Sequence, residues 1–331
     1  MTKRFFSTDT DSGTLTVLER SDGALREISK IAVGNGPRGG VQFTSDGRGY
    51  VGNTAGNTIS EIDALTLRET AKITVGIAPI GVGLIPGDRY ALVSNSGSNY
   101  VSVVDLGLRQ EIHKVATGRE PRHMAITPDG SAAYVAISGA DYVAKIDTSA
   151  LANNQVESIE TDVREVARIS VGDGAMPYSV GIVPDGSLAF AVNNQGAYTT
   201  IIDLTNDTVV ANVDLGGKGG RGVAFTPDGK RAFVTVEDAN EVVAIDVDSR
   251  AVVNRFETGP GPRGLVFDAA EGVLYSTNFA RSRSVGVLTA PNTISSIDFS
   301  GSLLDALEKA TPNYAEVPVG AGPCSVTIFE S

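Results

Sequence analysis

The chain has 331 residues, of which 41% are hydrophobic and 20% are charged, and its formal net charge is −12. These fractions are ordinary for a globular protein, and the acidic balance argues against nucleic acid as a partner, because phosphate backbones are held by a concentrated basic face. A single cysteine, Cys324, excludes an internal disulfide, and with only two histidines, His113 and His123, the chain lacks a His- or Cys-rich metal cluster.

The N-terminal segment MTKRFFSTDTDSG lacks the apolar stretch of a signal peptide, and no run reaches the eighteen apolar residues of a membrane span. We therefore expect a cytoplasmic protein, although a mature exported chain would read the same way. The segment begins with alternating apolar residues, which predict three strands near KRFFSTD (3–9), GTLTVLE (13–19) and REISKIAV (26–33).

A repeat then runs along the chain. A short apolar residue or Thr precedes Gly, Pro usually follows, and an alternating apolar stretch and a turn come next. In the unit that starts at Gly118, the strands PRHMAIT (121–127), AAYVAI (132–137), DYVAKID (141–147) and VARISVG (166–172) alternate with turns. The repeat occurs seven times, at Gly34, Gly76, Gly118, Gly172, Gly216, Gly259 and Gly320. Four strands per unit predict an all-β, seven-bladed β-propeller that spans residues 1–331 as a single domain.

Two units are longer than the others. Residues 148–165 form an insertion in the fourth blade, which we expect to be a loop or a short helix. A second insertion, near 289–314 in the seventh blade, contains SGSLLDALEKATPNY (300–314), which predicts a short helix that begins at a Ser and ends before Pro312. This helix would pack on the side of the propeller or bind a partner.

The two ends of the chain complement each other. Three strands precede Gly34 and one strand, PCSVTIFE (323–330), follows Gly320. One strand and three strands make a complete blade. We therefore predict that the C-terminal strand is the innermost strand of the blade begun by the N-terminus, which would remove the free edges of an open array.

The repeat resembles the YVTN-type β-propeller family, whose units run from Gly-x-x-Pro through a Pro-Asp-Gly turn, a Tyr-Val-Thr-Asn strand and an Ile-Asp strand. The matching segments are GREPRHMAITPDGSAAYVAI (118–137), GGRGVAFTPDGKRAFVTV (219–236) and NTISEID (57–63). The full tetrad is absent; Tyr50-Val51-Gly52-Asn53 and Tyr275-Ser276-Thr277-Asn278 come closest. The resemblance implies the propeller fold. It leaves function open, because similar propellers include surface-layer and periplasmic binding proteins, lactonases, streptogramin-type lyases and haem-bearing reductase domains.

Candidate site residues gather where the innermost strand of each blade starts and the second strand ends, since these two places meet at one mouth of the central channel. The starts carry four arginines, whose guanidinium groups suit a carboxylate or a phosphate, and the second-strand ends carry amides. Either set could instead tie blades together or form turns. The predicted ligand-binding residues are Arg38, Arg122, Arg221, Arg263, Asn53, Asn95, Asn194 (with Asn193 as its alternative) and Asn278. The remaining starts are Ile80, Tyr178 and Cys324.

His123 and Tyr178 are the candidate catalytic residues, because an imidazole can act as a general acid or base and a phenol can donate a hydrogen bond. A packing role is the alternative for both, and Cys324 is expected to be a buried, inert thiol. The aspartates that close the third strands are interpreted as turn caps rather than metal ligands. They are Asp63, Asp105, Asp147, Asp203 and Asp246.

Two functions follow from these residues. The first is a binding or scaffold propeller, expected to be a monomer, that holds an anionic small molecule or an acidic segment of a partner protein. The second is a lyase, isomerase or lactone hydrolase that uses His123 or Tyr178 while the arginines polarise a carboxylate. A haem or quinone domain is disfavoured, since no C-x-x-C-H motif is present, and we expect no cofactor.

Overall fold

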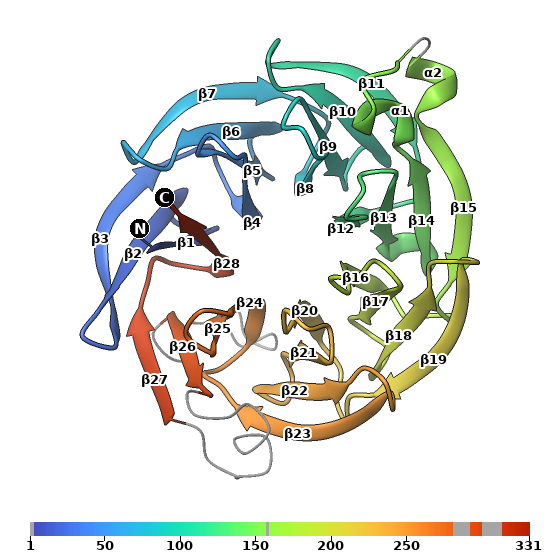
Figure 1. Cartoon of the computed structure of the whole chain (residues 1–331). Coiled ribbons are helices and arrows are strands. Elements are labelled where there is room, and N and C mark those ends of the chain that lie inside the picture. The colour runs from blue at the N-terminus through green and yellow to red at the C-terminus, as the bar shows by residue number, and fades with distance from the viewer. Residues whose placement is uncertain (1–2, 157–158, 281–291, 300–312) are drawn as a thin grey trace.

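The computed structural model describes residues 3–156, 159–280, 292–299 and 313–331. Seven antiparallel sheets of four strands each are arranged as blades around a central channel (Figure 1). The predicted seven-bladed propeller is thus confirmed. Among the described residues, no helix is long and apolar enough to cross a membrane. Within the same ranges, no group of three His, Cys, Asp or Glu side chains could hold a metal ion.

The strands of each blade follow one another from the channel to the periphery. Blade 1 contains β28 (Pro323–Glu330), β1 (Lys3–Asp9), β2 (Thr14–Ser21) and β3 (Ala24–Ala32); blade 2, β4 (Pro37–Phe43), β5 (Arg48–Asn53), β6 (Thr58–Asp63) and β7 (Arg68–Thr74); blade 3, β8 (Pro79–Leu84), β9 (Tyr90–Asn95), β10 (Tyr100–Asp105) and β11 (Gln110–Ala116). Blade 4 contains β12 (Pro121–Ile126), β13 (Ala132–Ile137), β14 (Tyr142–Asp147) and β15 (Arg164–Ser170); blade 5, β16 (Pro177–Ile182), β17 (Leu188–Asn193), β18 (Tyr198–Asp203) and β19 (Thr208–Asp214). Blade 6 contains β20 (Gly220–Phe225), β21 (Arg231–Val236), β22 (Glu241–Asp246) and β23 (Ala251–Glu257); blade 7, β24 (Pro262–Asp268), β25 (Val273–Asn278), β26 (Thr293–Asp298) and β27 (Asn313–Pro318).

The ring closes through the two ends of the chain, as predicted. Strand β28 pairs antiparallel with β1, from Lys3 opposite Glu330 to Asp9 opposite Pro323, and the dark red and blue strands lie side by side in Figure 1. The ammonium group of Lys3 also binds Asp268 of blade 7 at 2.7 Å and Glu330 at 3.1 Å. The seam is therefore joined to its neighbouring blade by both backbone and charged contacts.

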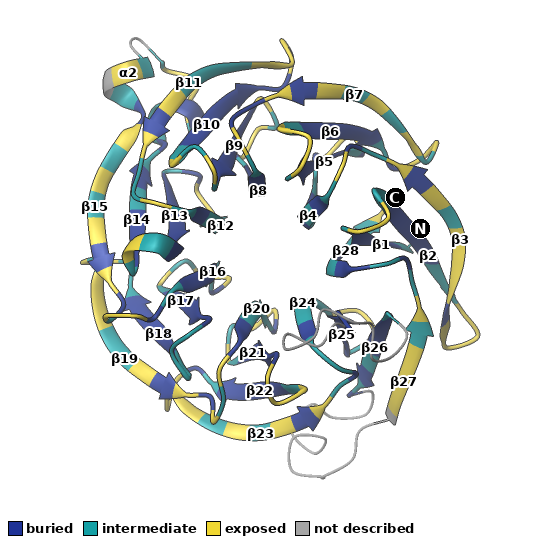
Figure 2. Ribbon diagram, turned by 180° about the vertical axis from the view of Figure 1, so that it is seen from behind, coloured by how far each residue is buried: buried dark blue, intermediate teal, exposed yellow. Residues whose placement is uncertain are grey.

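The apolar core lies between the blades. Second strands are buried on both faces, and β9 has no exposed residue, because each blade packs against a neighbour on either side. Outer strands such as β7 instead alternate between exposed and covered residues, which Figure 2 shows as yellow bands along the rim. Tyr50 and Ile59 of blade 2, for example, pack against Val93 and Val104 of blade 3. The apolar residues of each strand that point toward a neighbouring blade thus form the interface between blades.

The aspartates that end the third strands cap turns, as predicted. The Oδ1 atom of Asp63 accepts hydrogen bonds from the backbone N–H groups of Leu65 and Thr66 at 2.8 and 2.9 Å. These bonds hold the pKa of Asp63 below its ordinary value, although burial opposes them. The equivalent acceptors are Asp105, Asp147, Asp203 and Asp246, which bind the N–H groups of Leu108, Ser149, Thr205 and Ser249.

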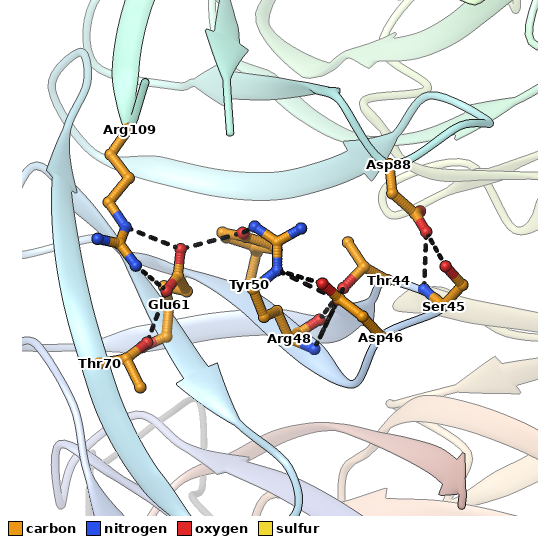
Figure 3. A network of polar contacts seen from close by, with 9 residues as sticks. All are labelled: Thr44, Ser45, Asp46, Arg48, Tyr50, Glu61, Thr70, Asp88 and Arg109. Atoms are coloured by element: carbon orange, nitrogen blue, oxygen red, sulfur yellow. Dashed lines mark hydrogen bonds and ion pairs between the residues drawn. The ribbon is translucent and has the colours of Figure 1, made fainter. Parts of the chain in front are cut away.

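A buried carboxylate links blades 2 and 3 (Figure 3). Glu61 of β6 accepts a hydrogen bond from Arg109 of blade 3 at 2.8 Å, from Thr70 at 2.7 Å and from Tyr50 at 3.1 Å. Burial alone would raise the pKa of Glu61, but these donors outweigh it and hold the pKa below its ordinary value. The carboxylate therefore stays charged inside the ring, with its oxygens satisfied.

The two predicted insertions differ in what the structure shows. In blade 4, the helices α1 (Ser149–Ala152) and α2 (Ile159–Asp162) lie between β14 and β15, which agrees with the expected loop or short helix. The helix predicted at 300–314 falls on residues outside the described ones, apart from Asn313 and Tyr314, which belong to β27. The range 289–314 also contains β26, so this part is regular blade; its sequence NTISSID (292–298) repeats NTISEID (57–63).

Candidate functional site

A cavity of about 130 Å³ lies in the central channel, where the innermost strands of six blades begin. The predicted residues His123, Tyr178, Arg221 and Arg263 line it together with Cys324. Four of its other wall positions are glycines, which bring the strands close, and Ser325 adds a hydroxyl; the glycines are Gly39, Gly40, Gly222 and Gly264. At Gly264 an added Cβ would overlap the backbone of Ser325, and at Gly222 that of Arg263, so these two positions require glycine.

Two of the arginines share one buried carboxylate. Arg221 Nε donates to Glu237 Oε2 at 2.6 Å, and Arg263 Nη2 donates to Glu237 Oε1 at 3.0 Å. The side chain of Glu237 is only 5% exposed and those of both arginines 14%. The guanidinium group of Arg263 also lies 3.7 Å from the centre of the Phe279 ring. These charge-assisted bonds fix both guanidinium planes at the wall of the cavity.

Tyr178 stands between two arginines. The centre of its ring lies 4.3 Å from the guanidinium carbon of Arg221 and 5.5 Å from that of Arg122. Arg122 in turn binds Glu120 at 2.9 Å, near the rim of the channel. The Tyr178 residue is 8% exposed, and its hydroxyl group forms no hydrogen bond with any described residue. The hydroxyl is therefore left to interact with the contents of the cavity.

The imidazole of His123 packs against Tyr178, with 5.2 Å between the ring centres. Burial, followed by the positive charges of Arg122, Arg38 and Arg221, lowers the pKa of His123 from 6.5 to about 3. His123 is consequently neutral at physiological pH and is a weak base there. A bound anion would cancel part of the arginine field and raise this pKa, so the imidazole can report the charge of the cavity.

Several guanidinium nitrogens in the channel are not satisfied by the protein. Arg38, on β4, forms no hydrogen bond or ion pair with the described part of the chain, and its Nε is buried. The Nε atoms of Arg122 and Arg263 are also buried without a partner among the described residues. Buried donors are normally paired, so these nitrogens indicate either ordered water or a ligand.

The predicted asparagines occupy two different environments. Asn53, Asn95 and Asn278 lie within their blades, where each Nδ2 donates to a serine of the third strand at 2.6–2.8 Å. The repeated glycines make room for this arrangement, because a Cβ at Gly34 or Gly76 would overlap the neighbouring Asn. The strand register explains why these side chains do not reach the cavity. The three asparagines lie opposite Pro37, Pro79 and Pro262 of the innermost strands, and their side chains lie on the face of the sheet that carries the third-strand serines.

Asn194 follows β17 by one residue and differs from the other three. Its Nδ2 donates to the carbonyl of Gly220 in blade 6, at 3.4 Å, so that it lies between blades at the mouth. Thr10 and Thr54 occupy equivalent positions, and their hydroxyls donate to the carbonyls of Pro37 and Pro79 at 2.8 Å. Whether any of these amides contacts a ligand stays a prediction.

Sequence reasoning missed Glu237 and Phe279. Both stand one residue after a second strand, at the position that Thr10, Thr54 and Asn194 occupy in other blades. If the repeats had been compared at the position one residue after the second-strand asparagines, Glu237 and Phe279 would have appeared as an acidic and an aromatic residue among small polar ones. These two residues are the partners that hold Arg263 at the cavity wall.

The sequence model of the YNCE-like beta-propeller family matches residues 90–290, which is more than half of the chain. A search of the curated proteins finds no match. Among solved structures, Kuenenia stuttgartiensis hydrazine synthase is similar with a TM-score of 0.70 and 23% identity, over 88% of this chain and 95% of that one.

Two further structures have the same fold. A candidate 6-phosphogluconolactonase from Bacteroides fragilis has a TM-score of 0.77 and 15% identity, over 99% of this chain and 98% of that one. The dihydro-heme d1 dehydrogenase NirN, in complex with DHE, has a TM-score of 0.66 and 14% identity, over 94% of this chain and 63% of that one. At these identities the likeness extends to the fold alone.

Proposed function

The chain belongs to the YNCE-like β-propeller family, and we propose that it binds a small anion, a carboxylate or a phosphate, in the cavity of its central channel. The observation that carries this proposal is the set of guanidinium groups at the cavity. Arg221 and Arg263 line it and share the buried carboxylate of Glu237. Arg122 lies over the Tyr178 ring, and the charges of Arg122 and Arg38 act on His123, a residue of the cavity wall. The excess positive charge and the unpaired Nε donors suit a ligand that brings negative charge.

The size of the cavity favours a small molecule over a segment of a partner protein. A volume of about 130 Å³ lies below the ~300–1,000 Å³ that is usual for the pockets of drug-sized ligands. A phosphate ion or a short dicarboxylate suits a cavity of this size better than a peptide segment does. We therefore assign the acidic protein segment a secondary place, as a partner that could insert only one carboxylate side chain.

Binding is favoured over catalysis by the state of His123. With a pKa of about 3, its imidazole cannot serve as an efficient general base at neutral pH. A propeller enzyme remains the second candidate, because the unpaired hydroxyl of Tyr178 could act on a lactone and because a candidate lactonase shares the fold. In that case a pH-stat assay with gluconolactone would show hydrolysis that Tyr178→Phe abolishes.

Isothermal titration calorimetry with inorganic phosphate and with malonate tests the binding proposal. Arg38→Met is the informative variant, since Arg38 has no partner among the described residues and its loss strands no buried carboxylate. Arg26→Met is the matched control, because Arg26 lies on the outer strand β3 with its side chain 66% exposed. We expect Arg38→Met to weaken binding roughly tenfold or more and Arg26→Met to leave it unchanged. Absence of binding to the unmodified protein, or equal binding by Arg38→Met, would contradict the proposal.

A further inference from the structure

Cys324 contributes the one thiol of the chain to the wall of the anion cavity. We propose that Cys324 is a covalent modification site selective for small electrophiles that carry a carboxylate. This inference rests on the proposed anion site and adds a reaction to it. It departs from the expectation that the thiol is inert.

The thiol is held in place yet reachable. Cys324 is the second residue of β28, the strand that closes the ring, and its residue is partly exposed. Arg263 Nη1 donates to the Sγ atom at 3.7 Å, and Arg263 is itself fixed by Glu237. Strand β28 pairs with β1 on both sides of Cys324, which is the unpaired residue of a bulge between Pro323 and Ser325, so the backbone that carries the thiol is held at the cavity.

Tyr178 provides an independent indication that the cavity is built for a ligand. This residue is 92% buried, since 8% of it is exposed, and it lines the same cavity as Cys324. Its hydroxyl has no hydrogen-bond partner in the described part of the chain. A hydroxyl without a protein partner is left to bond with water or with a ligand in the cavity. A carboxylate in the cavity could accept this bond while its other end faces the thiol.

The arginine field selects the charge of the reagent. A cleft lined by charges of one sign raises the local concentration of counter-ions by about 10-fold to 1,000-fold. Iodoacetate and iodoacetamide have nearly the same size and the same reactive carbon, but only the first is an anion. In both reactions Sγ attacks the CH₂ carbon, the C–S bond forms as the C–I bond breaks, iodide leaves with the electron pair, and the thiol proton passes to solvent.

The test measures the ratio of the two alkylation rates by intact-protein mass spectrometry. The ratio of iodoacetate to iodoacetamide is determined for the native protein and for the same chain unfolded in urea, which gives the intrinsic preference of the thiol. We expect the native ratio to exceed the unfolded one by roughly tenfold or more. Cys324→Ser should remove the label, which confirms the site. An unchanged ratio, or a native thiol that neither reagent modifies, would overturn the proposal.

Arg38→Met should reduce the native ratio toward the unfolded value, whereas Arg26→Met should not. The outcomes also separate this inference from the binding proposal. If phosphate binds in calorimetry but the native ratio is unchanged, the anion site stands and the modification site falls. If the ratio rises while neither phosphate nor malonate binds or slows labelling, reversible anion binding fails and the covalent site is retained.

Discussion

Asp9 is the buried carboxylate at the seam of the ring, and its replacement by Asn should stabilise the protein at neutral pH. The residue is fully buried, and its oxygens accept hydrogen bonds from Thr16 at 2.6 Å, Thr14 at 3.2 Å and Ser7 at 3.1 Å. Burial nevertheless raises its pKa from 3.8 to about 6, against the opposing effect of these bonds. Four other blades have Asn at this position: Asn53, Asn95, Asn193 and Asn278.

The pH dependence follows from the direction of this shift. The folded state favours the protonated carboxyl group, so the stabilisation is fully present below pH 3.8, declines as pH rises, and is lost above about pH 6. A shift of about two units corresponds to about 3 kcal/mol at ~1.4 kcal/mol per unit. Asp9→Asn removes the titration. It should therefore unfold at a similar urea concentration to the unmodified protein at pH 4 and at a clearly higher one at pH 7.5.

Urea unfolding followed by far-UV circular dichroism, at several pH values and constant ionic strength, measures the difference. Asp63→Asn is the control of opposite sign, because turn hydrogen bonds lower the pKa of Asp63 and its charged form stabilises the fold above pH 4. That variant should lose stability at neutral pH. A difference between Asp9→Asn and the unmodified protein that stays constant from pH 4 to pH 7.5 would refute the reasoning, as would a loss of stability at pH 7.5.

Three further outcomes are expected. Removing residues 324–331 deletes most of β28 and exposes the edge of β1, so the protein should lose its cooperative unfolding transition. Removal of Ser331 alone should leave that transition intact. A folded, monomeric product of the longer truncation would contradict the closure argument. Gly34→Ala should lower the free energy of unfolding by about 1–3 kcal/mol, because the added Cβ atom would overlap the side chain of Asn53. Gly107→Ala is the control and should be nearly neutral in the same urea assay, because its added Cβ atom would contact only Asp105 Oδ1, at 3.4 Å. The His123 imidazole should stay neutral from pH 5 to 8 in an NMR titration, and malonate should raise its pKa; a midpoint near 6.5 without ligand would disprove the buried, arginine-flanked environment.

The sequence by itself determined the number of blades, most strand boundaries and the closure of the ring. The predicted ranges 3–9, 132–137 and 323–330 coincide with β1, β13 and β28. They could be predicted because the alternation of apolar residues and the turn residues are local features of the sequence that recur in every repeat. The turn-capping aspartates were predictable for the same reason, since donor and acceptor are two or three residues apart.

Only the tertiary structure decided which side chains meet. A strand places successive side chains on opposite faces, so a shift of one residue separates Asn278, inside its blade, from Phe279, against Arg263. The pairing of Arg221 and Arg263 with Glu237 joins blades 6 and 7, and its geometry depends on how two sheets pack rather than on any local pattern. The sequence predicted arginines at one mouth; the packing of the blades selected the ones that line the cavity and brought the thiol of Cys324 to them.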